Sequence, residues 1–438
     1  MVAMKNPGAA VPGGLRYLGP REAFQKRCIE ERLVQVFVQW GFSEIVTPTI
    51  EYFDVISAGM GERLRDRMYR FLDRTGQIIV LRPDITTPIA HFAATELRDE
   101  PRPLRLFYLG SVFRAGSPQT GMRQESYQAG AEVIGAAGNA ADAEVIALAI
   151  QCLKATGLQG FRVGIGHAGI IHYIAEQVGL DPRQEDLVRD ALARHDFVAL
   201  REVAGSLDLP SRKLEWLLTI PALHGKGEIL KAALAPPLSP PGGQVTARGD
   251  GGGIEVLHSL GTILENLESR GLGDFVDIDL GLVRDLDYYT GIIFEAYAYG
   301  VGRPVCGGGR YDRLLESFGA GEPATGFAID IEGLGAALAA SAASHAAPSA
   351  QGLEAQGRER AGHGFELRGP DYFVIPQSEA ASIEAARVAA GLRDAGHSVE
   401  LEIVSRGIED SIDYGMRRKA GSIIIVDESG NTREVKAE

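Results

Sequence analysis

The order of strand and helix signals along the chain restricts its fold more than any other feature. Two strand-like runs, residues 104–116 and 125–135, flank a Ser-Pro-Gln-Thr-Gly loop. A mostly helical region follows at residues 170–235, and strand signals return at 275–284 and 291–299. Strands on both sides of a helical insert are typical of an α+β fold with an antiparallel sheet, and not of a βαβ repeat. We therefore predict such a sheet with flanking helices.

The residues before these strands carry periodic patterns of their own. Residues 20–40 predict an amphipathic helix, in which Pro20 suits the first helical position. Residues 42–48 predict a strand that a proline stops. The other elements expected in this part are a hairpin at 68–72 and 77–82 and helices at 86–96 and about 141–156.

The C-terminal part of the chain has a different composition. Residues 336–369 are rich in Ala, Ser, Gly and Gln, which predicts a linker. Residues 370–438 then alternate as β-α-β-α-β and predict a small α/β domain with a parallel sheet. We expect a core at residues 10–335, with a helical insert at about 170–260, followed by the linker and this small domain.

Composition and charge exclude several classes of protein. Apolar runs fall short of the roughly 18–20 residues that span a bilayer, and the N-terminal residues lack a signal peptide's apolar stretch, so we expect a cytoplasmic protein with no membrane partner. The three cysteines are far apart and the nine histidines lack metal-ligand spacing, which predicts neither a disulfide framework nor a metal site. The net charge of −14 argues against a nucleic-acid partner, because phosphate backbones require basic surfaces.

Four segments combine polar, aromatic and glycine residues in patterns that suggest a binding site. In the first, residues 81–87, Asp84 and Thr86 follow a strand. An acid and a hydroxyl at this place could hold an ammonium group. The alternative is a helix N-cap, a position that Asp and Thr favour.

The second segment combines Arg114 with residues 127–132 of the following strand. Gln128 and Glu132 share one face of that strand because side chains alternate with a period of two. Arg114 on the facing strand could contact a carboxylate or phosphate through two hydrogen bonds. The alternative is a polar sheet face that is open to water.

The third and fourth segments lie close together in the sequence. Residues 281–291 contain Arg284, Tyr288 and Tyr289, and a guanidinium with two phenols suggests recognition of a small polar ring. The alternative is a structural turn with a paired arginine and aspartate. The glycines at 307–309 would let the backbone approach a ligand closely, although a glycine run alone is weak evidence for phosphate binding.

Taken in this order, the four segments resemble the class II histidyl-tRNA synthetases. The resemblance rests on Leu-Val-Arg-x-Leu-Asp-Tyr-Tyr at 282–289, on Gly-Gly-Arg-Tyr-Asp at 308–312 and on the glycine-led motif at 326–334. It covers roughly residues 10–335, and the C-terminal domain resembles a shortened anticodon-binding domain. The resemblance implies a class II aminoacyl-tRNA synthetase-like fold with a pocket for free histidine.

The resemblance also assigns individual residues by their motif positions. It implies that Asp84, Thr86 and Gln128 face the α-amino group of histidine. Glu132 and Tyr289 would face the imidazole.

Further residues would complete the pocket. The resemblance implies that Arg114 and Arg284 lie near the carboxylate of histidine. Tyr288 and the glycines at 307–309 would form walls. It implies no cofactor.

Several positions depart from the synthetase pattern. In the synthetases, the loop after the motif-two arginine carries a glutamate and basic residues that orient ATP, whereas Gly116 and Met122 stand at two of these positions here. Gly333 replaces the arginine that clamps the ATP triphosphate, and Asp285 replaces a glycine. Adenylation depends on preorganised positive charge around the triphosphate. We therefore expect that activation of histidine with ATP is lost.

One known group fits this combination, the regulatory subunits of the short-form ATP phosphoribosyltransferase, which resemble histidyl-tRNA synthetases but lack aminoacylation. The resemblance implies a non-catalytic subunit, required for the first step of histidine biosynthesis and for feedback regulation by histidine. Its partners would be the short-form catalytic subunit, free histidine and a second copy of the chain, joined through residues 20–50. Many members of the group lack the C-terminal domain, whose presence here is a departure.

Two other interpretations stay open. A divergent histidyl-tRNA synthetase would activate histidine with ATP and charge tRNA, but Gly116, Gly333 and the acidic balance oppose this. A stand-alone histidine-binding module would keep the pocket and have an unrelated partner. Co-purification with a short phosphoribosyltransferase chain would exclude the latter.

Overall fold

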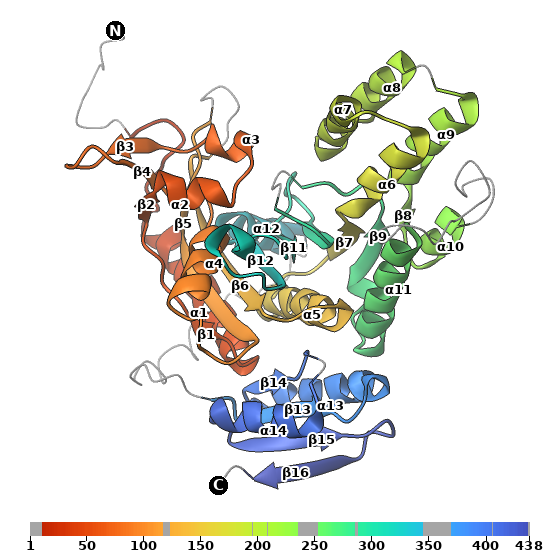
Figure 1. The fold of residues 1–438 in the computed structure, drawn as a ribbon. Helices are drawn as coiled ribbons and strands as arrows, with labels where there is room; N and C mark the ends of the chain where they lie inside the picture. Colours follow the sequence, from red (N-terminus) through yellow and green to blue (C-terminus); the bar gives the residue numbers. More distant parts are fainter. Residues whose placement is uncertain are drawn as a thin grey trace.

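A nine-stranded sheet forms the centre of the molecule (Figure 1). The computed structural model describes residues 11–116, 123–194, 196–207, 209–234, 253–284, 288–344, 369–404 and 406–436. The strand order is β1-β5-β6-β12-β11-β10-β7-β9-β8, with β1–β5 and β7–β9 parallel and the other pairs antiparallel. The strands are β1 (Ser43–Glu44), β5 (Leu104–Phe113), β6 (Glu125–Ile134), β7 (Phe161–His167), β8 (His224–Gly225), β9 (Val276–Asp279), β10 (Ile292–Ala298), β11 (Cys306–Arg310) and β12 (Ala324–Asp330). The predicted α+β fold is confirmed.

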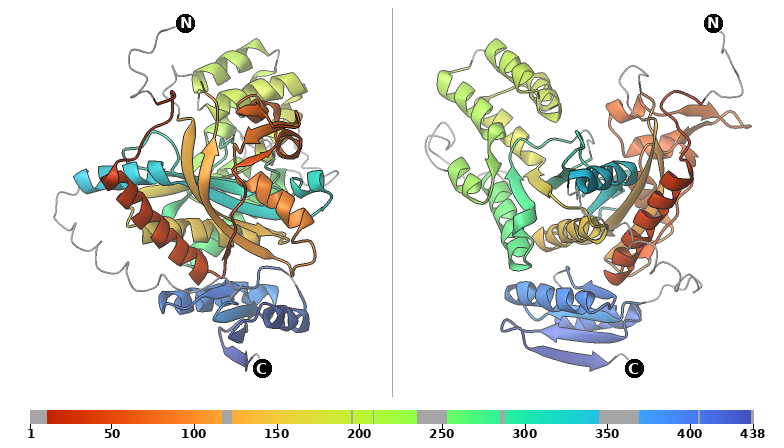
Figure 2. Two further views of the ribbon diagram at one scale, coloured as in Figure 1. Left: turned by 90° about the vertical axis from the view of Figure 1, so that its left-hand side faces the viewer. Right: turned by 180° about the vertical axis from the view of Figure 1, so that it is seen from behind.

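The two faces of this sheet have different surroundings. Four long helices cover one face (Figure 2): α1 (Pro20–Gln39), α5 (Asn139–Ala155), α11 (Gly253–Ser269) and α12 (Ile331–Ser344). Ala131 of β6 and Phe327 of β12 are buried in the main hydrophobic core on that side. Their neighbours Glu132 and Gly326, which are paired in the sheet register, face the other way because strand side chains alternate. The helix-free side of β6, β12 and β11 therefore carries the polar residues.

Shorter elements surround that polar face. A three-stranded antiparallel sheet, β2-β4-β3, and the helix α4 lie on one side of it. Their bounds, with those of two adjoining short helices, are β2 (Ile50–Tyr52), α2 (Phe53–Ala58), α3 (Glu62–Arg65), β3 (Arg70–Leu72), β4 (Ile78–Leu81) and α4 (Thr86–Thr95). The hairpin and the helix expected here are confirmed. The strand expected at 42–48 is reduced to the two residues of β1.

The insert lies on the opposite side and is helical, as the sequence predicts (Figure 1). It contains α6 (Gly169–Val178), α7 (Pro182–Ala193), α8 (Phe197–Ser206), α9 (Ser211–Thr219) and α10 (Glu228–Leu234). Asp181 caps α7 by accepting a hydrogen bond from the Gln184 N–H at 2.9 Å. This cap fixes the start of the helix that borders the polar face.

The C-terminal domain packs below the core. Its elements are β13 (Tyr372–Pro376), α13 (Ser382–Asp394), β14 (Val399–Leu401), α14 (Ile408–Arg417), β15 (Ser422–Val426) and β16 (Thr432–Lys436). The first three strands in chain order pair in parallel as predicted, but β16 adds an antiparallel edge strand that the sequence analysis missed. Its residues are mostly polar and only Val435 packs against the core, so the strand lacks the apolar alternation by which a buried strand is recognised.

Four strands of the main sheet were also missed. The glycines at 307–309 form most of β11, and a period cannot be read from residues without side chains. Strands β7, β8 and β12 likewise went unassigned. Helix α12 continues past residue 335 and ends at Ser344, and residues 345–368 of the expected linker lie outside the described residues.

A buried ion-pair network joins the C-terminal domain to the core. Glu144 of α5 accepts hydrogen bonds from Arg270 at 2.8 Å and from Arg393 of α13 at 2.9 Å. Arg105 of β5 lies 3.7 Å from Glu144 and 3.1 Å from Glu400 of β14. Burial would raise the pKa of Glu144, but the guanidiniums of Arg393, Arg270 and Arg105 lower it to about 2. The contact between the two domains is thus held by charge as well as by apolar packing.

No described helix has both the length and the apolar composition needed to cross a membrane.

Removal of the Glu144 charge should loosen this junction. Glu144→Gln is expected to lower the free energy of unfolding by about 3–5 kcal/mol, because several buried guanidiniums lose their shared carboxylate. Since the pKa of Glu144 is lowered on folding, this contribution is present above about pH 4.5 and is lost toward pH 2. Urea denaturation followed by the fluorescence of Trp40, over which Arg393 stacks, measures the change.

Glu384→Gln is the matched control for that variant. It removes an exposed ion pair with Arg387 in the same domain and should cost less than about 1 kcal/mol. Equal losses for the two variants would show that the buried network does not hold the junction.

Candidate functional site

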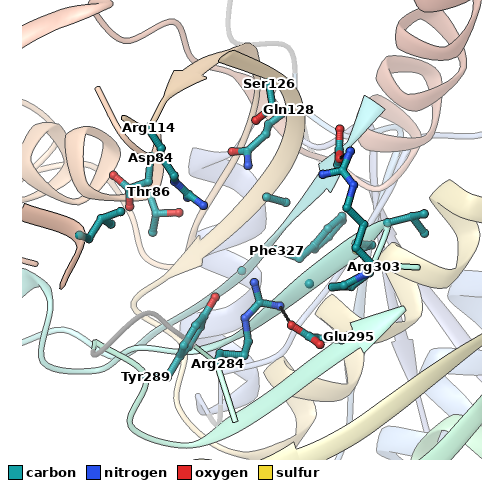
Figure 3. A pocket seen from close by; sticks show the side chains of 18 of the residues that line it. Asp84, Thr86, Arg114, Ser126, Gln128, Arg284, Tyr289, Glu295, Arg303 and Phe327 are labelled. Carbon is teal, nitrogen blue, oxygen red and sulfur yellow. Dashed lines mark ion pairs between the residues drawn. The ribbon is translucent and has the colours of Figure 1, made fainter. Parts of the chain in front are cut away.

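A cavity of about 680 Å³ opens on the polar face of the sheet, between the N-terminal elements and the helical insert (Figure 3). Its size is in the range usual for small-molecule sites. All eight residues that the sequence analysis assigned to a pocket line it: Asp84, Thr86, Arg114, Gln128, Glu132, Arg284, Tyr288 and Tyr289. The structure thus brings together residues that are up to about 200 positions apart in the chain.

Small residues form the floor of the cavity. In the sheet register, Gly326 pairs with Glu132, and Ala328 pairs with both Gly130 and Gly307. A Cβ atom added at Gly326 would lie 1.7 Å from Glu132 Oε2, and one added at Gly307 would lie 1.6 Å from Arg284 Nη1. These glycines therefore make room for the two charged side chains above them.

Glu132 is the most deeply buried acid of the cavity and is only 1% exposed. Its Oε1 accepts a hydrogen bond from the Thr86 hydroxyl at 2.7 Å, and its Oε2 accepts one from the hydroxyl of Tyr311. Burial raises its pKa to about 8, against the opposing effect of these two hydrogen bonds. Glu132 is therefore mostly a neutral acid at pH 7, which both donates and accepts hydrogen bonds.

Asp84 lies just before α4, and only one of its two carboxylate oxygens has a hydrogen-bond partner among the described residues. Its Oδ2 accepts hydrogen bonds from the Thr87 hydroxyl at 3.0 Å and the Thr87 N–H at 3.4 Å. Its buried Oδ1 has no hydrogen-bond partner among the described residues. Burial raises the pKa of Asp84 to about 6, so it is mainly ionised at pH 7. Oδ2 thus bonds to the first turn of α4 as a cap would, although Ile85 occupies the N-cap position, and Oδ1 is buried without a partner among the described residues.

Arg284 brings positive charge to the opposite wall. Its Nη1 pairs with Glu295 at 3.2 Å and donates to the Phe294 carbonyl at 3.2 Å, while its guanidinium lies 5.5 Å from the centre of the Tyr289 ring. Its buried Nε has no hydrogen-bond partner among the described residues. Glu295 in turn accepts a hydrogen bond from Tyr297 at 2.7 Å. These contacts hold the guanidinium in one orientation.

Arg114 and Arg284 approach the cavity from different sides (Figure 3). Arg114 donates from Nε to the Pro83 carbonyl at 2.8 Å and lies next to Asp84. Gln128 lies at the far end of the floor from Glu132, on the same strand. Tyr288 packs 4.9 Å from Tyr289 and 5.6 Å from Tyr311, measured between ring centres. The predicted aromatic wall is present and also includes Tyr311.

Two positions at which the sequence departs from the synthetase pattern can be located. The Gly116 carbonyl accepts a hydrogen bond from Gln124 at 3.0 Å, and Gly333 lies in the first turn of α12. Met122 and Asp285 lie outside the described residues. The cavity is not poor in cations, however, because its lining includes Arg67, Arg114, Arg194, Arg284 and Arg303. The acids Asp84, Glu132, Asp190, Glu295 and Asp330 line it as well.

Sequence reasoning missed several residues of the site. Tyr311 and Tyr108 are buried beside Glu132, and Glu295 orients Arg284. The position of Tyr311 directly after the glycine strand was the available signal. Arg310 of the same motif points away from the cavity and pairs with Asp142 of α5 at 2.9 Å. It anchors β11 to the helix that covers the other face.

The arrangement suits a small zwitterionic molecule. A carboxylate with an unpartnered oxygen, a neutral buried acid and a fixed guanidinium line one cavity. Buried polar groups gain most from a ligand when the ligand supplies the missing hydrogen bonds. Among the described residues, no cluster of three or more histidines, cysteines and carboxylates has metal-binding geometry.

Comparison with known proteins gives a consistent result. Residues 14–334 match the family model for histidyl-tRNA synthetase. A histidyl-tRNA synthetase from a Nostoc species has the same fold, with a TM-score of 0.60, 18% identity and coverage of 98% of this chain and 97% of that one. At that level of identity, the likeness concerns the fold alone.

Relatives with higher sequence identity are named as ATP phosphoribosyltransferase regulatory subunits. The ATP phosphoribosyltransferase regulatory subunit of Symbiobacterium thermophilum is 39% identical and covers 94% of this chain and 96% of its own length, and that of Moorella thermoacetica is 39% identical with 87% and 96% covered. A solved structure described as an ATP phosphoribosyltransferase regulatory subunit/histidyl-tRNA synthetase from Bacillus halodurans is 30% identical, with a TM-score of 0.66 and coverage of 96% and 98%. The chain therefore belongs to the family of ATP phosphoribosyltransferase regulatory subunits, which shares the fold of the histidyl-tRNA synthetases.

Proposed function

We propose that this chain is a regulatory subunit that assembles with the short-form catalytic chain of ATP phosphoribosyltransferase and binds free histidine in the cavity. The name shared by its relatives supports the regulatory role and disfavours the divergent synthetase. The observation that carries the histidine proposal is the buried Asp84 oxygen that has no partner among the described residues, in a cavity that Glu132 and Arg284 also line. We propose no catalytic role for this chain.

Each part of a histidine molecule has a matching group in the cavity. The ionised Asp84 would accept hydrogen bonds from the α-ammonium group, and Arg284 would offer its buried Nε to the carboxylate. Glu132 would face the imidazole. A neutral carboxyl suits a neutral imidazole because each has one donor and one acceptor in reach of the other.

Regulation would follow from a difference in affinity between two states of the assembly. Histidine, the end product of the pathway, can shift an equilibrium only by binding one global state more tightly than the other. Couplings of this kind are about 1–3 kcal/mol, or roughly 5–150-fold in affinity. The cavity borders both α7 of the insert and the N-terminal elements, so a ligand in it would contact both parts of the chain.

We also propose that two copies of this chain form a homodimer. Exposed apolar side chains are frequent in the N-terminal part of the chain, where Val46 is 80% exposed and Leu72 is 72% exposed. Further members of this set are Phe24, Val38, Ile50, Tyr52, Phe71 and Ile78. Four of the eight lie in the segment 20–50 that the sequence analysis assigned to a dimer contact, and Ile50 is its last residue. Exposed apolar residues become buried when they form an interaction surface, which supports a contact in this part of the chain.

The first prediction concerns Glu132. Glu132→Gln keeps the shape of the side chain, and we expect histidine affinity to fall at least about tenfold, the effect of losing a strong buried hydrogen bond. Because the pKa of Glu132 is raised on folding, the wild-type chain loses stability as pH rises from about 4.5 through about 8. The variant lacks this loss, so its melting temperature relative to wild type should rise over that range while its histidine binding stays weaker.

Calorimetry and thermal scans at pH 5, 7 and 9 test this prediction. Glu125→Gln, on the same strand but outside the cavity, is the control and should change neither property. Gln128→Ala should weaken histidine binding without the pH-dependent change in stability. Unchanged histidine binding in Glu132→Gln would place histidine elsewhere.

The second prediction tests the assembly directly. Addition of this chain to a short catalytic subunit should give histidine-sensitive formation of phosphoribosyl-ATP, whereas the chain alone should not exchange pyrophosphate into ATP in the presence of histidine. With a Glu132→Gln and Gln128→Ala double variant, activation should persist and histidine sensitivity should fall. Retained feedback in the double variant would show that histidine acts at another site, such as the catalytic chain.

The third prediction concerns the dimer. Val46→Asp combined with Leu72→Asp should convert a dimer of this chain to monomers, because two charges are placed in an apolar contact. Leu187→Asp, at a 53% exposed position on α7, is the control and should leave the dimer intact. Light scattering coupled to size-exclusion chromatography measures the mass, and an unchanged dimer in the double variant would refute this surface.

A further inference from the structure

Asp330 lies at the end of the cavity floor that is farthest from Glu132. It is the last residue of β12 and pairs in the sheet register with Gln128, whereas Gly326 of the same strand pairs with Glu132. Four residues of extended strand separate the two ends by about 13 Å. The floor therefore has two separate carboxyl groups, one beneath each end of the cavity.

The carboxylate of Asp330 is held by the groups that commonly bind an anion in proteins. Its Oδ1 accepts hydrogen bonds from the N–H groups of Glu332 and Gly333 in the first turn of α12, both at 3.1 Å. Its Oδ2 pairs with Arg303 at 2.6 Å. Helix N-terminal N–H groups together with a guanidinium form the usual binding arrangement for a phosphate.

Two more arginines converge on the same helix end. Arg123, from the β5–β6 connection, and Arg16, from the N-terminal segment, both pair with Glu332, the latter at 3.5 Å. Burial and the neighbouring guanidiniums of Arg16 and Arg303 lower the pKa of Arg123, which confirms that the three cations lie together. Three arginines from distant parts of the chain thus surround two carboxylates.

The glycine at position 333 is fitted to this arrangement. A Cβ atom added there would lie 2.8 Å from Asp330 Oδ2 and 3.6 Å from Arg303 Nη2. A larger side chain would therefore press on the ion pair between Asp330 and Arg303. Glycine at position 333, in place of the arginine of the synthetases, therefore leaves room for the ion pair between Asp330 and Arg303.

We propose that Asp330 determines the charge selectivity of the cavity: its carboxylate takes the place of a phosphate between Arg303 and α12 and excludes phosphate-bearing ligands. The guanidinium of Arg303 is thereby already paired with a carboxylate of the chain itself. A zwitterion without a phosphate does not need Arg303, because Asp84, Glu132 and Arg284 supply polar and charged groups elsewhere in the cavity. This inference does not depend on the proposal that histidine occupies that end.

The physical reason is competition between like charges. A phosphate that approached Arg303 would meet a fixed carboxylate within the low-dielectric interior, where repulsion is stronger than in water. Displacing Asp330 would also remove the cap from the N-terminus of α12, which costs about 0.5–2 kcal/mol. Without the negative charge of Asp330, the same arginine and N–H groups become available to an external anion.

The test measures binding of inorganic pyrophosphate by calorimetry. Asp330→Asn keeps an oxygen that can cap α12 but removes the charge, and Asp330→Ser keeps a capping hydroxyl, so at least one variant should preserve the fold. Both should bind pyrophosphate at least about tenfold more tightly than the wild-type chain. Asp274→Asn makes the same charge change at an exposed position away from the cavity and should gain nothing.

A second set of variants assigns the gain to this site. Adding Arg303→Ala to Asp330→Asn should abolish the gained affinity, because the freed guanidinium is then missing. Equal pyrophosphate affinity in the wild-type chain and both Asp330 variants would overturn the inference, as would a gain that survives Arg303→Ala. Histidine titrations of the same proteins test the proposed function separately, since histidine binding should persist in the Asp330 variants whatever the result with pyrophosphate.

Discussion

The antiparallel pairing of β6 with β12 is the constraint on which the site depends. The register sets Glu132 beside Gly326 and Gln128 beside Asp330, and the two-residue period puts all four on the face away from the long helices. A slip of one residue would bury these polar groups in the hydrophobic core and expose Ala131 and Phe327. The cavity therefore forms only when the sheet folds with this register.

Several polar groups of the cavity are buried in states that are unfavourable in the empty protein. Glu132 is kept neutral by burial, Asp84 has an oxygen without a partner, and Arg284 has a nitrogen in the same condition. Groups in this state reduce the stability of the empty protein, because buried polar atoms without hydrogen bonds lose their solvation without compensation. A ligand that completes these bonds recovers that free energy. The same features that weaken the empty chain thus give the cavity its capacity to respond to a ligand.

Much of the architecture could be predicted because its signals are local. Helix α1 follows from the apolar spacing after Pro20, and the pairing of β5 with β6 follows from two long strand patterns that are close in sequence. Strand β11 could not be recognised, because its glycines carry no pattern. The site residues were found through motif resemblance, whereas the roles of Tyr311 and Glu295 depend on packing between distant strands. The contacts of Asp330 with Arg303 and α12 are likewise tertiary and have no signature in the sequence.

The network of Arg105, Glu144 and Glu400 has a consequence for how such a chain can change in evolution. Arg105 and Glu144 belong to the core, and both are completely covered when the C-terminal domain is present. A descendant that lost residues after α12 would leave a fully charged, formerly dry surface beside α5, two residues from the Asp142 that anchors Arg310. Loss of the small domain would therefore require compensating substitutions on β5 and α5. For this reason we expect the small domain and these core residues to be retained together.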